Sequence, residues 1–263
     1  MRIDVKEYIK TRKENLKLTP FKKLLIIQVG DNEASNKYIK GKIKDCNEVG
    51  YKATLIKFPD EVEALEIYNY INTFGQNYHG IILQEPANII SSIRCSKDDI
   101  INAIKDCQDI DGFKNTSKHK PCTPLGIINF LKDYLKVENF KGKIIAVIGK
   151  GKLVGAPLVP MLMAEGATII NCNSSTADIG SMTRLADIVV TCTGHPHLIT
   201  RDMLKDSTIV IDAGIAFDEN GKMCGDCDKT LYDDENIFIT TVPGGVGLLT
   251  RVTLLENLNR SLS

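Results

Sequence analysis

The sequence predicts an α/β fold with two domains. Three observations lead to this prediction. Short apolar runs such as residues 24–29 alternate with helical patterns, which is typical of parallel sheets covered on both faces. The chain has 263 residues, which is enough for one large domain or two of ordinary size. A change from the first such series to a second falls between about residues 112 and 142.

The first series is bounded by glycine and proline. A helix is expected to stop before Pro20, the next helix before Gly50, and a short buried strand before Pro86. The expected helices span residues 3–18, 33–49, 61–73, 98–105 and 124–135, and the expected strands span residues 24–29, 51–58 and 80–84.

The second series follows a Lys-Gly-Lys turn at residues 141–143. We expect strands at 144–148, 167–172, 186–192, 208–212 and 237–241, with helices at 156–165 and 249–261. The predicted domains are residues 1–123 with 249–263, and residues 124–248 as a Rossmann-type parallel sheet. The last helix is expected to pack back on the first domain.

Composition excludes several classes of protein. Lys+Arg and Asp+Glu both number 33, so the net charge is zero, which argues against a nucleic-acid binder. No apolar run approaches the roughly 18–20 residues of a membrane span. Asp4 and Glu7 stand where a signal peptide would be apolar. We therefore expect a cytoplasmic protein without nucleic-acid or membrane partners.

The cysteines are expected to be reduced thiols that pack as small hydrophobic side chains. The exception to weigh is Cys224-Gly-Asp-Cys227, because a CxxC pair can be a redox pair or half of a zinc site. No second CxxC follows it, so we expect no metal.

A glycine-rich turn follows the strand at 144–148. Its sequence is Gly149-Lys150-Gly151-Lys152-Leu153-Val154-Gly155, between a strand and a helix. Such a turn lets the backbone and a helix N-terminus approach a diphosphate. A tight structural turn is the alternative. We favour a dinucleotide site.

The expected cofactor is NADP, with NAD possible. An NAD site usually has an acidic residue soon after the next strand, but none occurs before Asp178. Lys150 and Ser174 would instead meet a 2′-phosphate, unless Lys150 is a solvated loop residue. Further candidates end later strands, where ligands sit in open sheets; they are Thr193, Gly194 and Ile215.

Tyr38 and Lys42 are four residues apart, so they share one face of the predicted helix. An aromatic ring can stack on a flat heterocycle, and a desolvated lysine can exchange protons near neutrality. The alternative is a solvated basic face, because Lys37, Lys40 and Lys44 lie on the same helix.

Other candidates lie at strand ends and in loops. Gln84 ends a strand, and Asp111 in Asp-Ile-Asp-Gly is either part of an Asx turn or an acceptor for ring N–H groups. The segment Pro243-Gly244-Gly245 is either a plain loop or a close approach of backbone to ligand.

Together these segments resemble the bifunctional methylenetetrahydrofolate dehydrogenase/methenyltetrahydrofolate cyclohydrolase family. The resemblance covers about residues 24–258. It rests on VGDNEASNKYIKGK (29–42), GIILQEP (80–86), DIDGF (109–113), PCTPLG (121–126), GKGKLVGAPL (149–158), DAGI (212–215), GD (225–226) and VPGGVG (242–247).

The resemblance implies a folate-binding domain, a Rossmann NAD(P) domain, tetrahydrofolate substrates and a homodimer. It implies that Lys42 is the cyclohydrolase acid/base, that Gln84 tunes it, and that Tyr38 lies against the folate. Asp111 would anchor the pterin, and Ser35 belongs to the same motif. The residues that would line the dinucleotide are Gly149, Lys150, Gly151, Ser174 and Ile215.

The chain departs from the family pattern at several positions. It has Lys150-Gly151 for Arg-Ser, Asn173 for His, Glu85 for Leu, Gln108 for Lys, and Leu248-Leu249 for Pro-Met. Glu85 and Gln108 are expected to change the charge near the substrate loops. The alternatives are therefore a dehydrogenase without cyclohydrolase activity, a folate- or nucleotide-binding protein without chemistry, and a shikimate-type dehydrogenase.

Overall fold

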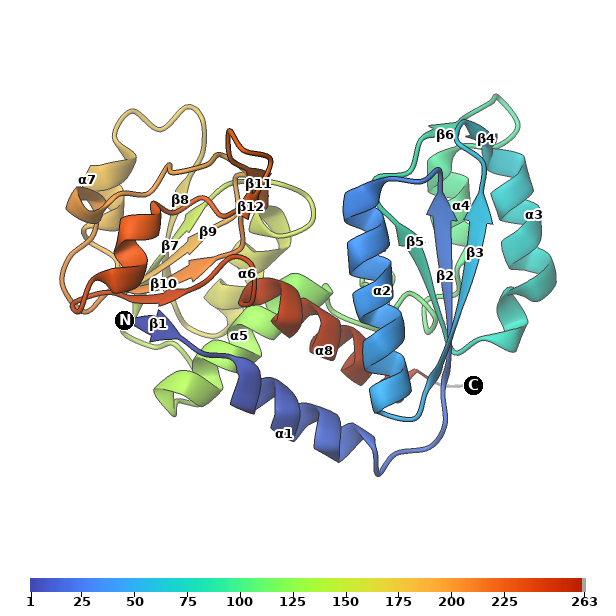
Figure 1. Cartoon of the computed structure of the whole chain (residues 1–263), viewed down its shortest axis with the longest axis horizontal. Coiled ribbons are helices and arrows are strands. Elements are labelled where there is room, and N and C mark those ends of the chain that lie inside the picture. Colours follow the sequence, from blue (N-terminus) through green and yellow to red (C-terminus); the bar gives the residue numbers. More distant parts are fainter. Residues whose placement is uncertain (262–263) are drawn as a thin grey trace. The chain divides into compact units, whose positions relative to one another are not determined.

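The computed structural model describes residues 1–261, which divide between two compact units. The six-stranded unit, named for its main sheet, comprises Met1–Ile9 and Thr123–Thr250. The three-stranded unit comprises Lys10–Cys122 and the chain from Arg251 onward. Figure 1 labels the elements of both units.

The three-stranded unit is built on a parallel sheet of order β3-β2-β5. Its strands are Lys23–Val29 (β2), Lys52–Phe58 (β3) and Gly80–Gln84 (β5), with a short parallel pair Val62–Glu63 (β4) and Ile89–Ile90 (β6). Its helices are Glu33–Glu48 (α2), Ala64–Phe74 (α3) and Lys97–Ala103 (α4), while Lys6–Leu16 (α1) joins the two units along the chain.

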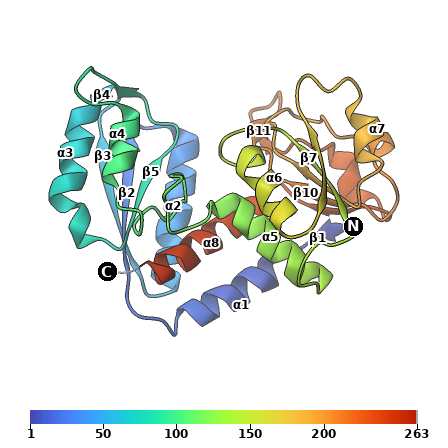
Figure 2. The ribbon, with the colours of Figure 1, turned by 180° about the vertical axis from the view of Figure 1, so that it is seen from behind.

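Helices cover both faces of this sheet, and the side chains of β2 alternate between the two faces. Leu24 and Ile26 pack in one core cluster with Ile39 of α2. Leu25 and Ile27 pack in another with residues of α3 and α4. Figures 1 and 2 show α2 on one side of the sheet and α3 and α4 on the other. This arrangement explains the continuous apolar run of β2.

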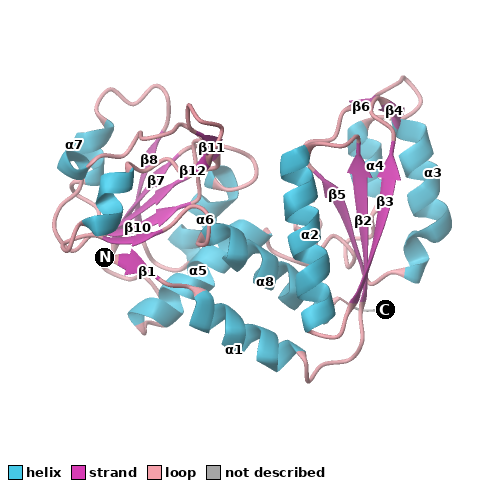
Figure 3. Cartoon of the chain, in the orientation of Figure 1, coloured by secondary structure: helices cyan, strands magenta, loops and turns pink. Residues whose placement is uncertain are grey.

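The six-stranded unit has a fully parallel sheet of order β1-β13-β10-β9-β7-β8, drawn in magenta in Figure 3. The strands are Arg2–Ile3 (β1), Ile144–Ile148 (β7), Thr168–Cys172 (β8), Ile188–Thr191 (β9), Ile209–Asp212 (β10) and Phe238–Thr240 (β13), with a hairpin Ala216–Phe217 (β11) and Met223–Cys224 (β12). The helices are Cys122–Leu135 (α5), Gly155–Ala164 (α6) and Ile179–Thr183 (α7). The last helix, Val246–Arg260 (α8), begins in this unit and continues into the three-stranded unit from Arg251 onward.

The structure confirms the predicted fold class, including the return of the last helix. Leu254, Leu255 and Leu258 of α8 pack in the same core cluster as Leu24 and Ile26 of β2. The apolar C-terminal half of α8 therefore belongs to the three-stranded unit.

The predicted start of the first helix is wrong, because the helix begins at Lys6 rather than at residue 3. Residues 1–9 group with the six-stranded unit. The reason is a parallel pairing of Arg2 with Ile239 and Ile3 with Thr240. Two strand residues that pair 237 positions away carry no local pattern by which a sequence could reveal them.

None of the helices within residues 1–261 has the length and apolar character that a membrane span requires. Over the same described residues, no three His, Cys, Asp or Glu side chains come together as metal ligands would. Cys224 and Cys227 are buried free thiols.

Candidate active site

Lys42 lies on the buried face of α2. The helix begins where the Asn32 side chain accepts the backbone N–H of Ser35, a typical N-cap. Lys42 is only 9% exposed, whereas Lys40 and Lys44 on the same helix are exposed. The structure thus decides between the two interpretations of this helix, because a solvated basic face would leave Lys42 in water.

Gln84 holds the ammonium group of Lys42. The Lys42 Nζ donates to Gln84 Oε1 at 3.0 Å. Gln84 Nε2 donates to the Glu85 carbonyl at 2.7 Å, and Ser35 Oγ donates to the same carbonyl at 3.2 Å. The Gln84 amide is therefore oriented with its oxygen toward Lys42, and three predicted residues form one network.

Tyr38 lies one helical turn before Lys42, and its ring is half-buried. Burial raises the pKa of its hydroxyl, and the nearby positive charge of Arg251 partly opposes this rise. The phenol is therefore neutral at physiological pH. The ring is available as a flat apolar surface beside the ammonium group.

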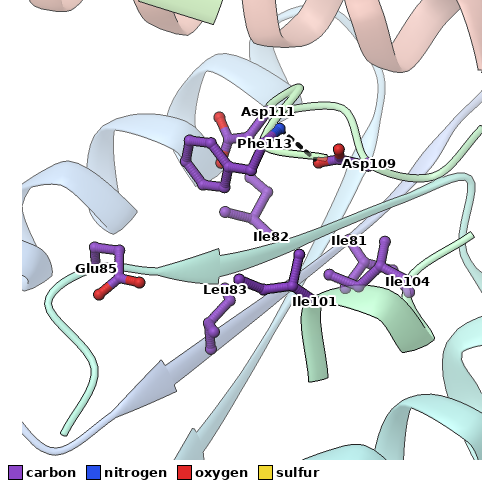
Figure 4. A pocket seen from close by; sticks show the side chains of 9 residues that line it. All are labelled: Ile81, Ile82, Leu83, Glu85, Ile101, Ile104, Asp109, Asp111 and Phe113. Carbon is purple, nitrogen blue, oxygen red and sulfur yellow. Dashed lines mark hydrogen bonds between the residues drawn. The ribbon is translucent and has the colours of Figure 1, made fainter. Parts of the chain in front are cut away.

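Asp111 lines a pocket of the three-stranded unit (Figure 4). Burial raises the pKa of its carboxyl, and the positive charge of Lys42 opposes that rise. The other lining residues come from β5 and the residue after it, from α4, and from the loop between α4 and α5; they are Ile81, Ile82, Leu83, Glu85, Ile101, Ile104, Asp109 and Phe113.

Asp109 and Asp111 have different roles in their loop. The Asp109 carboxylate accepts the backbone N–H groups of Phe113 at 3.3 Å and Lys114 at 2.8 Å, so Asp109 makes the turn (Figure 4). Gly112 has φ +72°, and a Cβ there would lie 2.6 Å from the Lys120 carbonyl carbon. The turn that the sequence allowed for this loop is real, but Asp109 makes it and leaves Asp111 facing the pocket.

The glycine-rich turn of the six-stranded unit follows β7. Strand order reverses here, because β8 lies on one side of β7 and β9 on the other. Ligands of open parallel sheets bind at such a switch point. Lys150 is exposed on the turn.

The glycines of this turn have two different uses. Gly149 has φ +119°, and a Cβ there would lie 2.8 Å from the Cys192 carbonyl oxygen. A Cβ on Gly155 would lie 2.2 Å from the Gly149 carbonyl oxygen. These two glycines let the turn pack against β9 and α6. At Gly151 a Cβ would meet nothing within 4 Å, so this position is open to a ligand.

The remaining predicted cofactor residues follow the carboxyl ends of neighbouring strands. Ser174 comes after β8, Thr193 and Gly194 come after β9, and Ile215 comes after β10. Ser174, Gly194 and Ile215 are exposed. They share the edge of the sheet at which the glycine-rich turn lies.

Two buried carboxylates hold this edge together. Asp226 Oδ2 accepts the Thr191 hydroxyl at 2.6 Å and the Thr193 backbone N–H at 2.7 Å. Asp212 accepts the backbone N–H groups of Gly214, Asp226 and Cys227. Both aspartates stand in motifs that were noted in the sequence, but they were given no role. The signal for Asp212 is an acidic residue at the end of a buried strand, where charge is costly unless it is hydrogen-bonded.

Pro243, Gly244 and Gly245 follow β13 and lead into α8. They belong to the six-stranded unit, whereas Ser35, Tyr38 and Asp111 belong to the three-stranded unit. Gly244 has φ +108°, and a Cβ on Gly245 would lie 2.7 Å from the Thr241 carbonyl oxygen. The conformation of this segment therefore requires its glycines.

Comparison with known proteins identifies the family. The model of the tetrahydrofolate dehydrogenase/cyclohydrolase catalytic domain matches residues 1–111, and that of the NAD(P)-binding domain of the same enzymes matches residues 121–263. The chain belongs to the tetrahydrofolate dehydrogenase/cyclohydrolase family. This membership decides against the shikimate-type alternative.

Relatives of known structure and name agree across nearly the whole chain. The bifunctional protein FolD of Mesoplasma florum is 41% identical over 248 residues, covering 89% of this chain and 84% of that protein. The crystal structure of the bifunctional enzyme FolD from Campylobacter jejuni is 34% identical with a TM-score of 0.89, covering 99% of this chain and 98% of that one. The Trypanosoma brucei FolD, solved with NADP cofactor and inhibitor, is 25% identical with a TM-score of 0.87, covering 98% and 95%.

Gln108 and Glu85, the two positions where the charge differs from the family pattern, both have local partners for their side chains. Gln108 is buried and donates to the carbonyls of Gly75 and Tyr78, so its neutral amide is held by the backbone of the three-stranded unit. Glu85 does line the pocket, but its carboxylate lies 2.6 Å from Lys97 Nζ. Its negative charge is thereby paired.

Proposed function

We propose that this member of the tetrahydrofolate dehydrogenase/cyclohydrolase family oxidises 5,10-methylenetetrahydrofolate to the 5,10-methenyl cation with NADP. It then hydrolyses that cation to 10-formyltetrahydrofolate. The observation that carries the proposal is the buried Lys42 ammonium group, held 3.0 Å from Gln84 Oε1, in a chain matched by both family domains.

The six-stranded unit fits a dinucleotide. Gly151 faces open space and Lys150 is exposed beside it, at the switch point of a parallel sheet. NADP bound there would supply the hydride acceptor. The backbone of the turn would approach the diphosphate, while Lys150 would contact the 2′-phosphate.

The oxidation demands little acid–base chemistry from the protein. The folate nitrogens stabilise the methenyl cation once hydride has left, so the protein has to bind and orient the rings. In the proposed site, the ring of Tyr38 lies against the folate. Asp111 accepts the N–H groups of the pterin, which are natural donors to a carboxylate.

The hydrolysis requires proton transfer, and Lys42 is proposed to perform it. Water adds to the methenyl carbon and loses one proton. The ring then opens: the C–N bond to N5 breaks, the hydroxyl of the adduct loses its remaining proton to become the formyl carbonyl, and N5 takes up one proton. As the neutral amine, Lys42 accepts the first proton and returns one to N5, and the remaining proton leaves to water. Gln84 keeps Lys42 Nζ in place through its side-chain oxygen. This oxygen accepts a hydrogen bond but does not take up the proton.

Replacement of Lys42 by methionine tests this assignment. We expect Lys42→Met to lower cyclohydrolase activity by about 100-fold or more, since general acid–base catalysis contributes about 10²–10⁴-fold. Dehydrogenase activity should fall by less than about tenfold, because hydride transfer does not use this proton. The exposed Lys44 on the same helix gives the matched control, Lys44→Met, which should retain both activities.

The measurement is one spectrophotometric time course on the purified protein with 5,10-methylenetetrahydrofolate and NADP, with NAD in parallel. Reduced nicotinamide without build-up of the methenyl chromophore means that both activities are present. Methenyl accumulation in the wild-type protein would instead support a dehydrogenase without cyclohydrolase activity. No reduced nicotinamide in either assay would refute the dehydrogenase proposal, and unchanged hydrolysis in Lys42→Met would refute the role of Lys42.

Two further proposals concern the setting of the enzyme. We propose that it acts in the cytoplasm, supported by eight cysteines that are all free thiols. We also propose a homodimer, supported by the family resemblance alone. Sedimentation equilibrium tests the dimer, and a mass of 29.1 kDa at micromolar concentration would contradict it.

A further inference from the structure

A buried carboxylate lies one helical turn beyond Lys42. The side chain of Asp45 is 3% exposed, and Arg251 of α8 places Nε 2.6 Å from its Oδ2 and Nη2 3.3 Å from its Oδ1. Lys13 of α1 places Nζ 2.5 Å from the same Oδ1. All three residues belong to the three-stranded unit. A charge this deeply buried requires such partners.

The guanidinium group of Arg251 lies directly on the backbone of α2. A Cβ built on Gly41 would lie 2.2 Å from Arg251 Nη1 and 2.9 Å from its Cζ. The absence of a side chain at position 41 therefore makes room for the arginine. Gly41 is also the residue immediately before Lys42, so the structure places a fixed positive charge beside the proposed acid/base.

Without Arg251, Lys42 would have two competing partners. Residues three apart on a helix are neighbours, so the ammonium group of Lys42 can turn toward Asp45 as well as toward Gln84. A carboxylate attracts an ammonium ion more strongly than an amide oxygen does. In the structure Lys42 instead donates to Gln84, while Asp45 is paired with Arg251 and Lys13.

We propose that Arg251 is a positioning residue for the hydrolytic step: by pairing with Asp45, it keeps this carboxylate from drawing the Lys42 ammonium group away from Gln84. The inference rests on the proposed function of Lys42 as the acid/base. Arg251 itself exchanges no proton with the substrate. Its effect is to keep the Lys42 amine at Gln84, within reach of the reacting atoms, rather than at Asp45.

Other ionisable groups lie around Lys42, and none of them is substituted in the variants that test the proposal. They are Tyr38 and Cys46 on α2, Asp111 and its neighbour Asp109 in the loop after α4, and Cys122 at the start of α5. Burial raises the pKa of Cys46 to about 12 and that of Cys122 well above its ordinary value, so both thiols remain neutral in the assay range.

The experiment is a pH profile of cyclohydrolase activity for Arg251→Gln, with methenyltetrahydrofolate as the substrate. We expect the pH of half-maximal activity to rise by up to about one unit, because Asp45, then paired with Lys13 alone, interacts more strongly with Lys42 at the effective dielectric constant of a protein. The rate on the acid side should fall by about tenfold. Dehydrogenase activity should stay within about twofold, which also shows that the variant is folded.

A double variant separates the proposed mechanism from a purely structural role. Asp45→Asn combined with Arg251→Gln removes the competing carboxylate, so the profile should return toward that of the wild type. Gly41→Ala provides an independent approach, because its Cβ displaces the guanidinium group while alanine favours the helix. It should shift the profile in the same direction as Arg251→Gln.

Three outcomes would overturn the inference. These are an unshifted profile in Arg251→Gln, a shift that persists in the double variant, and an unshifted profile in Gly41→Ala. Lys42→Met keeps the inference distinguishable from the function on which it rests. Loss of hydrolysis in Lys42→Met with an unshifted Arg251→Gln profile refutes Arg251 alone, whereas retained hydrolysis in Lys42→Met refutes the proposed function itself.

Discussion

At the scale of single residues, burial distinguishes lysines that the sequence presents as equals. Lys40, Lys42 and Lys44 alternate along α2, yet only the middle one faces the core of the three-stranded unit. Its cost of burial is offset by a hydrogen bond to Gln84. In the glycine-rich turn the situation is reversed, because Lys150 and Lys152 are both exposed. These lysines can therefore contact only a ligand that binds at the surface of the turn.

Lys150 is predicted to select NADP over NAD. We expect Lys150→Ala to raise the KM for NADP by about tenfold, since a hydrogen bond between charged groups contributes roughly 1.5–3 kcal/mol. The KM for NAD, which has no 2′-phosphate, should change by less than about twofold. Initial-rate measurements with both cofactors check this. Lys152→Ala is the control in the same turn, and an equal loss for both cofactors in Lys150→Ala would contradict a phosphate contact.

At the scale of elements, helix α8 fixes the loop that carries Asp111. Asn257 is buried, and its Nδ2 donates to the carbonyls of Ile110 at 2.9 Å and Lys120 at 3.1 Å. These carbonyls flank the turn made by Asp109 and Gly112. One amide of the C-terminal helix therefore ties together the two ends of a loop more than 130 residues earlier in the chain.

Loss of this amide should weaken folate binding without affecting the dinucleotide. Asn257→Leu removes a donor from the Lys120 carbonyl and leaves the buried Ile110 carbonyl with the Cys122 thiol alone, at a cost of about 1–3 kcal/mol. We expect a lower midpoint of urea unfolding and a KM for methylenetetrahydrofolate raised several-fold, with the KM for NADP unchanged. Arg260→Ala, at the exposed end of the same helix, should leave all three quantities as they are. A normal folate KM in a destabilised Asn257→Leu protein would show that the loop is held by other contacts.

At the scale of the whole molecule, each unit is assembled from two separate segments of chain. The six-stranded unit takes its edge strand from the first nine residues, and the three-stranded unit takes part of its core from α8. The carboxyl edge of the larger sheet depends on Asp212 and Asp226, which are buried together. Burial, with the charge of Asp226 adding to it, raises the pKa of Asp212 to about 6.

This raised pKa makes a prediction for stability against pH. The folded protein binds the proton of Asp212 more tightly than the unfolded chain does. The resulting stabilisation is complete below pH about 4 and is lost as the pH rises through about 6. The free energy of unfolding of Asp212→Asn relative to the wild type should therefore increase between pH 4 and pH 7, by about 3 kcal/mol at most.

Urea unfolding at pH 4.5, 5.5 and 7.0 measures this difference. Asp218→Asn is a control of opposite sign, because the hydrogen bond from Lys229 lowers the pKa of Asp218. Its contribution to stability is present above the ordinary pKa and is lost as the pH falls. A difference between Asp212→Asn and the wild type that does not vary with pH would show that Asp212 titrates normally.

The sequence determined the class of fold because both sheets are parallel and covered. Strands buried on both faces must be apolar throughout, as in β2 and β7, and such runs are visible without any tertiary information. The glycine-rich turn was predicted for a similar reason. A side chain at Gly155 would collide with the Gly149 carbonyl, and one at Gly149 would collide with the Cys192 carbonyl. Glycine is therefore needed at both positions, and the glycine spacing is visible in the sequence. Ser35, Tyr38, Lys42, Gln84 and Asp111 were recognised as candidates because they stand in motifs of the family.

Tertiary structure decided what these residues touch. Whether Lys42 faced water or Gln84 depended on the packing of α2 against the sheet. Whether Glu85 carried a free charge depended on Lys97, and the importance of Gly41 became apparent only with Arg251 lying against it. These partners are separated along the chain by 12 to 210 residues. Hydrogen bonds and ion pairs between side chains act over a few ångströms in space, so the sequence names the groups that take part but the fold selects which of them meet.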